Sequence, residues 1–307
     1  MSREHVTDSA RIHHDWDESL APILEVESGD VVHFDLQVAG SGQVKLGDHF
    51  DDVRFDFETM YNLSGPVAVV GAEAGDTLCI EVLELVRSKW GWAAILPGFG
   101  LLASDFPDGY LRTFALDSEL GVDFSPGIRI PYRPFLGTMG VNPGGGVRLS
   151  PFPPHRGGGN IDNRYLTEGS RLYLPVFLPR ALFSCGDPHA VQGDGEVCIT
   201  ALESPLQASL RFTLQKRSLA APAFLNPGAG GSRAASEEYC VMGLAPDLMQ
   251  GAQTATRAMI TWLSEEHELS REDAYVLCSL AGQLRILEVV DAGMWNVAMC
   301  MPLALFN

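Results

Sequence analysis

The strongest constraint on the fold is an alternation of apolar and polar residues with a period of two. It is clearest at 206–214, where every second residue is apolar: Leu206, Ala208, Leu210, Phe212 and Leu214. Shorter runs with the same period occur at 32–36, 76–82 and 172–178. A period of two places alternate side chains on one face of a strand, so these segments predict half-buried antiparallel strands.

The last third of the chain changes to a helical period. Apolar residues fall at helical spacing over 248–263, after a Pro-Asp start signal. The Ser-Arg-Glu-Asp segment at 270–273 has the spacing of a helix cap and predicts a second helix over 271–281. Residues 284–290 return to a strand pattern. We therefore expect a mainly β fold, with β-sandwich or barrel lobes and an α/β C-terminal part.

Length and loop composition predict how the chain is divided. Its 307 residues exceed the usual size of one compact core, so two or three joined lobes are expected. Residues 226–236, rich in glycine, alanine and serine, are expected to link a β-rich region at 1–225 to an α/β region at 226–307. Residues 88–164 lack a long periodic run and combine glycine with proline. They predict a long irregular segment with a functional role.

The charge of the chain limits its partners. Thirty-nine acidic residues against 21 basic ones give a formal net charge of −18. Such a surface repels phosphate backbones and anionic lipids, so neither nucleic acid nor a membrane is expected as a partner. The chain also lacks the roughly 20 uninterrupted apolar residues that span a bilayer and the apolar core of a signal peptide. We expect a cytoplasmic protein that acts on a neutral or cationic small molecule.

The six cysteines show no metal-binding spacing. They are scattered without a CxxC pair, and several lie in apolar runs, so they are expected to be reduced core residues. Cys185 lies near polar residues, but it follows an apolar run and is expected to be a core thiol rather than a nucleophile. Neither a GxSxG nor an HExxH motif occurs.

The strongest concentration of chemically active residues lies at 186–196, within the β-rich region. Gly-Asp-Pro-His-Ala-Val-Gln-Gly-Asp-Gly-Glu contains Asp187, His189, Asp194 and Glu196. Carboxylates with one histidine suit a divalent cation: imidazole favours zinc, and carboxylates alone favour calcium, magnesium or manganese. Turns at Asp-Pro and Asp-Gly would account for the same residues, so the residues alone leave a metal role open.

A second group follows three glycines at 157–159. Glycine lets the backbone approach a ligand closely, and Asn160 and Asp162 then point to the same side if the chain is extended. A glycine-rich surface turn capped by these two side chains is the simpler interpretation.

Histidine is scarce in this sequence. Of eight histidines, only His13, His14 and His189 have carboxylates close by in a suitable pattern. Paired histidines near a terminus are often solvated, so His13 and His14 alone are weak candidates. Trp92 could line a pocket, and packing in the core explains it equally well.

Read together, these motifs resemble those of the acetamidase/formamidase family. The similar segments are 65–76, 91–100, 158–162, 172–177, 186–196 and 272–282. The most specific motifs are Gly-Gly-Asn-x-Asp and Gly-Asp-x-His-x-x-Gln-Gly-Asp-Gly-Glu. One segment departs from the family: Tyr132–Gly137 stands where formamidase-like members have His-Pro-Gly, which weakens formamide as the substrate and leaves the exact amide open.

The resemblance implies a bound divalent metal, self-association as a homodimer or larger homo-oligomer, and hydrolysis of short amides to a carboxylate and ammonia. Zinc is favoured, with calcium or another divalent ion as alternatives. Carried over to this sequence, the candidate metal ligands are His13, Asp162, His189, Asp194 and Glu196. The candidate catalytic residues are Glu196, His189 and Asp187, and the candidate substrate-binding residues are Asn160, Gln192 and Trp92.

The role of Glu196 stays open at this stage. It would take a proton from a metal-activated water and deliver it to the leaving nitrogen, or it would be a metal ligand. Two alternatives for the whole chain also remain. One is a hydrolase of another C–N bond, in a urea-like, cyclic or larger amide. The other is a non-catalytic β-sandwich that binds a small ligand and is stabilised by a cation.

Overall fold

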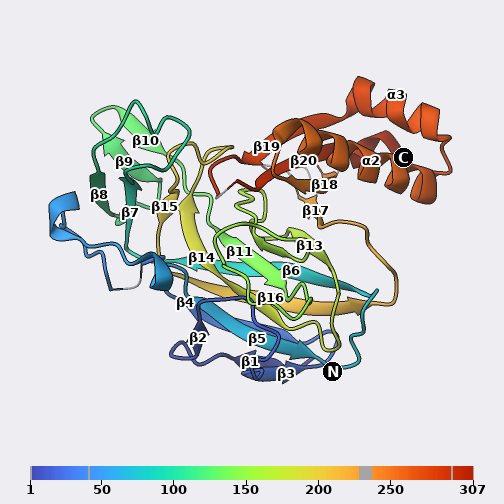
Figure 1. The fold of residues 1–307 in the computed structure, drawn as a ribbon, viewed down its shortest axis with the longest axis horizontal. Helices are drawn as coiled ribbons and strands as arrows, with labels where there is room; N and C mark the ends of the chain where they lie inside the picture. The colour runs from blue at the N-terminus through green and yellow to red at the C-terminus, as the bar shows by residue number, and fades with distance from the viewer. Residues whose placement is uncertain (1, 41, 228–236, 292, 307) are drawn as a thin grey trace.

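Two β-sheets packed face to face form the body of the protein (Figure 1), seen here in a computed structural model that describes residues 2–40, 42–227, 237–291 and 293–306. In spatial order, the first sheet contains β1 (Glu4–Val6), β4 (Val31–Leu36), β16 (Leu206–Gln215), β6 (Thr77–Arg87), β13 (Arg171–Pro175), β17 (Ala223–Asn226), β18 (Glu238–Ala245), β20 (Trp295–Pro302) and β19 (Gln283–Glu288).

The second sheet contains the strands that carry the candidate site. Its order is β12 (Gly158–Asn160), β11 (Phe135–Val141), β14 (Phe183–Val191), β15 (Leu202–Glu203), β7 (Trp90–Ile95) and β8 (Tyr110–Ala115). Three further strands extend it: β5 (Leu63–Val69) pairs with β14, and both β2 (Ile12–His13) and β3 (Leu24–Val26) pair with β5. A separate hairpin is formed by β9 (Val122–Ser125) and β10 (Ile128–Ile130). Short 3₁₀ helices lie at Phe50–Asp52, Phe57–Thr59 and Leu303–Phe306.

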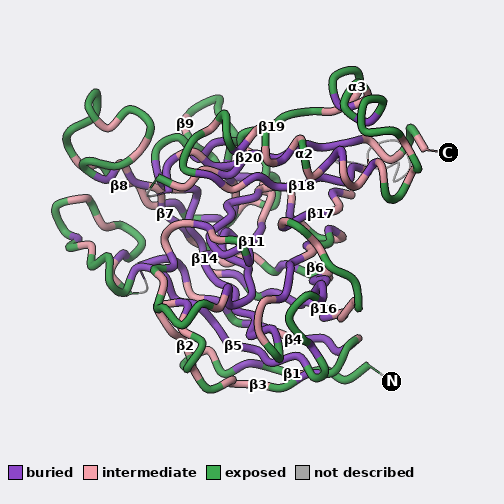
Figure 2. The backbone as a smooth tube through the Cα atoms, turned by 45° about the vertical axis from the view of Figure 1, so that its right-hand side comes forward, coloured by how far each residue is buried: buried purple, intermediate pink, exposed green. Residues whose placement is uncertain are grey.

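The alternating segments are strands, as predicted. In β16, Leu206, Ala208, Leu210 and Phe212 are buried. The main hydrophobic core contains side chains from both sheets. The ring of Phe183 on β14 packs edge to face on that of Phe212 on β16, with centroids 5.1 Å apart. Figure 2 shows the same layering, with buried backbone through β11 and β14 and exposed backbone in α3.

Both predicted helices are confirmed, with their starting signals. Helix α2 (Leu248–His267) begins after Asp247, whose side chain accepts a hydrogen bond from the backbone N–H of Gln250. Helix α3 (Arg271–Ala281) begins after Ser270, which caps it in the same way. The two helices pack against β18 and β20 in a separate apolar cluster. The fold is therefore mainly β with an α/β C-terminal part.

The first sheet crosses the predicted boundary between the two regions. Strand β17 ends at Asn226 and pairs with β18, which starts at Glu238. Most of the predicted linker, 228–236, lies outside the described residues. The division into 1–225 and 226–307 stays a prediction.

The prediction of a long irregular segment at 88–164 was wrong, because six strands, β7 to β12, lie within it. Glycines in this segment mark close approaches between strands rather than loops. A Cβ atom at Gly140 on β11 would lie only 2.5 Å from the backbone nitrogen of Gly159 on β12.

The cysteines follow the prediction with one exception. All six are free and five are buried, but Cys198 is exposed and so is not a core residue. No helix among the described residues is long and apolar enough to cross a membrane.

Candidate metal centre

A group of buried acidic side chains surrounds His189 at the end of β14. We call it the carboxylate cluster, and it consists of Asp162, Asp187, His189, Glu196, Glu203, Glu288 and Asp291. Strand β14 supplies Asp187 and His189, and β15 supplies Glu203. Strand β19 supplies Glu288 at its last position, and Asp162, Glu196 and Asp291 lie on the loops after β12, β14 and β19. Buried carboxylates are costly unless they are protonated, paired or bound to a cation, so this concentration requires an explanation.

The imidazole of His189 lies between two sets of carboxylates. Its Nε2 atom is 3.3 Å from Oδ2 of Asp187 and 3.3 Å from Oε2 of Glu203. Its Nδ1 atom is 3.8 Å from Oδ1 of Asp162. Two possible ligand triads therefore share His189: Asp187 with Glu203, and Asp162 with Glu196.

Several polar atoms of the cluster are buried without a hydrogen-bond partner among the described residues. They are both ring nitrogens of His189, both carboxylate oxygens of Asp162, and one carboxylate oxygen each of Glu203 and Glu288. Native proteins leave few such atoms unsatisfied, and an ion or water is the usual explanation when they gather in one place. The donor set therefore fits a bound cation.

The triad of Asp187, His189 and Glu203 is compact enough to hold one small divalent cation. Tetrahedral zinc with bonds of roughly 2.0 Å separates neighbouring ligand atoms by about 3.3 Å. Both distances from Nε2 have this value. The second oxygen of Glu203 accepts a hydrogen bond from the backbone N–H of Ala201 at 2.9 Å, which leaves Oε2 free for an ion. Three ligands would leave a fourth position for water or substrate.

The backbone is strained at three cluster residues. Asp162, Asp187 and Glu196 have φ angles of 40°, 52° and 47°, a region that residues other than glycine rarely adopt. Strain of this kind is retained where the surrounding structure holds a functional group in place.

Gly137 on β11 leaves the space that the cluster occupies. A Cβ atom there would lie 2.6 Å from a carboxylate oxygen of Asp162, 2.6 Å from one of Asp187, and 2.7 Å from Cε1 of His189. The carbonyl of Gly137 also accepts hydrogen bonds from the N–H groups of Ile161 and Asp162. The missing side chain of Gly137 thus leaves space for the carboxylate of Asp162, and its carbonyl group holds the backbone of Asp162 in place.

Burial and mutual repulsion raise the pKa values of several carboxyl groups in the cluster. Burial, followed by the charge of Asp187, raises the pKa of Asp162 to about 6. Burial also raises the pKa of Asp187 to about 6, against the opposing charge of His189. Burial and the charges of Asp162 and Asp291 raise the pKa of Glu196 well above its usual value.

At His189 the charges of its neighbours outweigh the effect of burial on the pKa. Burial disfavours its charged form, but the carboxylates of Glu203 and Asp187 outweigh burial and raise the pKa of His189 well above its usual value. The field around the imidazole attracts positive charge, which a divalent cation supplies as well as a proton does.

The sequence of the chain matches the model of a known protein family. The model of the acetamidase/formamidase family matches residues 1–150 and 144–307, which together cover the chain. The chain belongs to the acetamidase/formamidase family.

Two curated members of the acetamidase/formamidase family are similar in sequence. The chain is 26% identical over 242 residues to a formamidase of Methylophilus methylotrophus, a match that covers 61% of this chain and 60% of the formamidase. It is 27% identical over 249 residues to an acetamidase of Mycolicibacterium smegmatis, covering 60% of this chain and 61% of the acetamidase. The match thus spans about three fifths of the length of each relative.

Two solved family structures share the fold over almost the whole chain. An acetamidase from Bacillus halodurans superposes with a TM-score of 0.89 at 28% identity, covering 98% of each chain. An acetamidase from Yersinia enterocolitica gives a TM-score of 0.88 at 28% identity, covering 99% of this chain and 93% of that one.

Three of the five predicted metal ligands meet in the cluster: Asp162, His189 and Glu196. The other two lie elsewhere. The Nε2 atom of His13 is within 2.9 Å of the Ser184 hydroxyl, and its Nδ1 is within 2.7 Å of the carbonyl of Asp15. The exposed Asp194 accepts a hydrogen bond from the Tyr165 hydroxyl at 2.9 Å.

The amide of Asn160 is engaged within the protein. Its nitrogen donates to Oδ2 of Asp291 at 2.7 Å, and its oxygen accepts from the Thr138 hydroxyl at 2.5 Å. Asn160 therefore positions Asp291 at the edge of the cluster. Gln192 donates to the backbone carbonyl of Asp162 at 2.9 Å, and its side-chain oxygen has no described partner.

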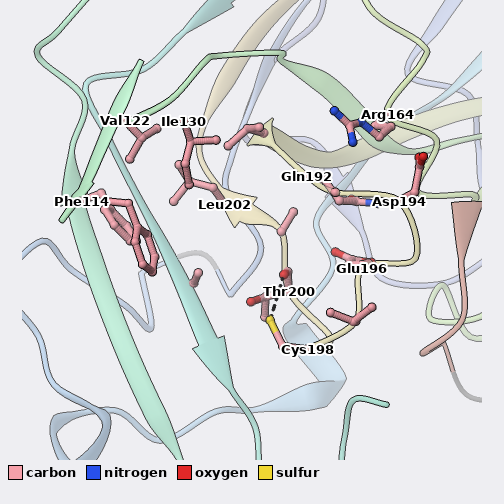
Figure 3. Close-up of a pocket in the computed structure, with 16 residues that line it drawn as sticks. Phe114, Val122, Ile130, Arg164, Gln192, Asp194, Glu196, Cys198, Thr200 and Leu202 are labelled. Carbon is pink, nitrogen blue, oxygen red and sulfur yellow. Dashed lines mark hydrogen bonds between the residues drawn. The ribbon is translucent and has the colours of Figure 1, made fainter. Parts of the chain in front are cut away.

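Two hollows adjoin the cluster. A small one of about 20 Å³, enough for one water-sized body, is lined by Tyr61, Trp92, Asp187, Glu196 and Glu203 among others. The indole N–H of Trp92 is buried there without a described acceptor. The other is an outer pocket of about 390 Å³. Figure 3 shows its apolar wall of Phe114, Val122, Ile130 and Leu202 facing Gln192 and Glu196.

Sequence reasoning missed four residues of the site: Tyr61, Glu203, Glu288 and Asp291. The three acidic residues lie in or next to an apolar run, where a charged residue was the available signal. No such signal marks Tyr61. Burial, then the charge of Asp187, raises the pKa of Tyr61 well above its usual value. Glu288 accepts a hydrogen bond from the N–H of Asp291 at 2.6 Å and thereby holds the loop that carries it.

Proposed function

We propose that this chain is an amidohydrolase that cleaves short linear amides to a carboxylate and ammonia, with a divalent ion in the carboxylate cluster. The observation that carries the proposal is the buried imidazole of His189, whose two unpaired nitrogens face unpaired carboxylates. Membership of the acetamidase/formamidase family supports amide hydrolysis as the reaction.

Asp187, Nε2 of His189 and Oε2 of Glu203 would hold the ion, and zinc fits their spacing best. Such an ion lowers the pKa of water to about 7 and polarises the amide carbonyl. Asp162 faces the other ring nitrogen, so it would accept the Nδ1 proton and fix the orientation and tautomer of the imidazole. This arrangement moves Asp162 and Glu196 from the predicted ligand set to supporting and catalytic roles.

Glu196 would move the proton. Its carboxyl group lines both hollows, so it lies between the cluster and the space open to a substrate. Its carboxylate would accept a proton from the attacking water as the new C–O bond forms, and the resulting carboxyl group would donate that proton to the leaving nitrogen as the C–N bond breaks. Burial and the charges of Asp162 and Asp291 raise the pKa of Glu196 well above its usual value, which favours its taking up that proton.

Trp92 and Gln192 would orient the amide. The indole N–H of Trp92 has no described acceptor, and the side-chain oxygen of Gln192 has no described donor. Trp92 lines the small hollow and Gln192 lines the outer pocket. A primary amide presents one acceptor oxygen and one donor nitrogen, so each of the two side chains could pair with one of these groups. Neutral polar groups also suit an uncharged substrate in a cluster that already holds excess negative charge.

The segment that departs from the family contacts the proposed metal ligand. Phe135, within Tyr132–Gly137, packs edge to face on His189 with ring centroids 4.9 Å apart. This segment differs in sequence from that of formamidase-like members, and through Phe135 it contacts the proposed metal ligand His189. We therefore propose acetamide or a slightly longer amide, rather than formamide, as the preferred substrate.

Ammonia release from a panel of acetamide, propionamide, formamide and urea tests the proposal. We expect release from acetamide and propionamide above that from formamide and urea. Release from urea alone would instead favour hydrolysis of another C–N bond. No release from any amide, by protein shown to carry metal, would favour the non-catalytic binding protein.

Self-association and a cytoplasmic location also remain predictions. The loop between β7 and β8 exposes Leu101, Leu102 and Phe106 by 57%, 54% and 51%. Adjacent exposed apolar residues of this kind are typical of a contact between proteins, and we propose that they lie in a dimer interface. Light scattering at micromolar concentration should give at least twice the 33.2 kDa of one chain.

A further inference from the structure

A third cavity, of about 520 Å³, lies outside the carboxylate cluster. Tyr132 and Arg133, which precede β11, line one part of it, and Arg164, Thr167 and Glu168 line another. No member of the carboxylate cluster lines this cavity. We call it the arginine cavity.

Two guanidinium groups in the arginine cavity lack an anionic partner. Neither the side chain of Arg133 nor that of Arg164 forms a hydrogen bond or ion pair with another described residue, and the Nε atom of Arg164 is buried without an acceptor. By contrast, the nearby Arg285 makes two hydrogen bonds to Glu238, at 2.7 and 2.9 Å. In a chain with 39 acidic and 21 basic residues, two unpaired arginines in one cavity are unexpected.

A third donor in the arginine cavity is also unpaired. The hydroxyl of Tyr132 is buried without a hydrogen-bond partner among the described residues. The carboxylate of Glu168 is already engaged, because it accepts a hydrogen bond from the N–H of Leu85 at 2.7 Å. The cavity therefore offers several donors and one carboxylate that is held elsewhere.

The positive charges repel one another around Tyr165. The guanidinium carbons of Arg133 and Arg285 lie 4.9 and 4.8 Å from the centre of its ring, and that of Arg164 lies 6.0 Å away. Burial, followed by the charge of Arg164, lowers the pKa of Arg133. The nearby carboxylate of Asp194 opposes this shift but is bound to the Tyr165 hydroxyl. A bound anion would relieve the repulsion.

We propose that the arginine cavity binds a small molecule that carries a carboxylate or phosphate group. The planar fork of an arginine donates two parallel hydrogen bonds to either group, and the Tyr132 hydroxyl can supply another. The arginine cavity shares no residue with the carboxylate cluster, although Ile130, Arg164 and Val191 line both this cavity and the outer pocket. The proposal therefore concerns anion binding and not the hydrolysis step.

Calorimetric titration with sodium phosphate and with sodium propionate tests the site, with sodium chloride at equal ionic strength as the reference. We expect saturable binding of at least one of the two anions. Arg133→Gln and Arg164→Gln should each weaken it at least about tenfold, because a charge-assisted hydrogen bond is lost. Arg164→Lys, which keeps the charge without the fork, should bind with intermediate affinity.

Arg257→Gln is the matched control, because Arg257 is an exposed arginine on α2 outside the arginine cavity. It should bind the anion as the wild type does. Heats no larger than those with chloride, or wild-type affinity in both cavity variants, would overturn the proposal. Binding of phosphate only, or of propionate only, identifies which anion the cavity takes. Because binding is measured rather than ammonia release, either result leaves the proposed hydrolase function to its own test.

Discussion

Oε2 of Glu203 lies 3.3 Å from Nε2 of His189, the same distance that separates this nitrogen from Oδ2 of Asp187. Glu203 and His189 are direct partners across β15 and β14. Opposite residues in antiparallel strands place their side chains together, so the sheet register brings a third ligand to a pair that lies on one strand. The candidate metal site is thus created by strand pairing rather than by one sequence motif.

Glu203→Gln and Glu196→Gln should have different effects on metal content. Glu203→Gln removes a ligand, so both bound metal and amidase activity should be lost. Glu196→Gln replaces a carboxyl group by an amide that cannot exchange a proton, so metal should stay while kcat falls by roughly 10²-fold or more. Elemental analysis and ammonia release on each variant separate the two roles. Metal loss in Glu196→Gln with metal retained in Glu203→Gln would assign the ion to the triad of Asp162, His189 and Glu196 instead.

Gly137→Ala should abolish metal binding without adding or removing a charge. The new methyl group would lie within 2.6 Å of oxygens of both Asp162 and Asp187, so the carboxylates must move apart. Gly193→Ala is the matched control, because a Cβ atom there meets no atom within 4 Å. Metal content should be lost in the first variant and unchanged in the second. Normal metal content in Gly137→Ala would show that the cluster geometry is not what binds the ion.

His13→Ala and Asp194→Asn should keep metal and most activity, although both residues were predicted as ligands from the sequence. His13 contacts Ser184 and Asp15, and Asp194 contacts Tyr165, so neither faces His189. The loss of a partly buried hydrogen bond in His13→Ala should cost about 1 kcal/mol of unfolding free energy. Stoichiometric metal loss in either variant would restore that residue to the ligand set.

His155 should make the protein sensitive to acid. Burial lowers its pKa from 6.5 to about 3, and its ring packs edge to face on Trp16 at 4.6 Å. The unfolded chain therefore takes up a proton at this residue first as the pH falls. The stability that its neutral form contributes is complete above pH 6.5 and is lost progressively toward pH 3, by up to about 1.4 kcal/mol per pH unit.

Urea unfolding of the wild type and His155→Gln at pH 7, 6 and 5 measures this effect. The stability of the wild type should fall more steeply than that of the variant between pH 6 and 5, by about 1 kcal/mol. Parallel pH dependence in the two proteins would mean that His155 is protonated as easily in the folded state as in the unfolded chain.

Local patterns predicted the elements that depend on local chemistry. The period-two strands, the caps at Asp247 and Ser270, and the change to helix near residue 248 are all present. The strands of 88–164 were missed, because glycine adds nothing to an alternation of apolar and polar side chains. At Gly137 a side chain is excluded by carboxylates that come much later in the sequence. The spacing of residues within one segment does not reveal a contact with a distant part of the chain.

The same limit applies to the site. Asp162, His189 and Glu196 were predicted, because they lie in specific motifs. Glu203 and Asp291 enter the site only through strand register and loop packing, since Glu203 lies opposite His189 and Asp291 is held by Asn160. Conversely, Asp194 belongs to a motif but faces Tyr165, and its position in the sequence gives no indication of that direction.

Metal content measured together with activity is the most direct test of a metal-dependent hydrolase built on His189. Tag-free protein should contain about one divalent ion per chain, with zinc expected. Removal of that ion with a chelator should abolish ammonia release from acetamide, and stoichiometric zinc should restore it. Full acetamide hydrolysis by protein shown to be free of zinc, calcium, manganese and magnesium would contradict this account of the carboxylate cluster.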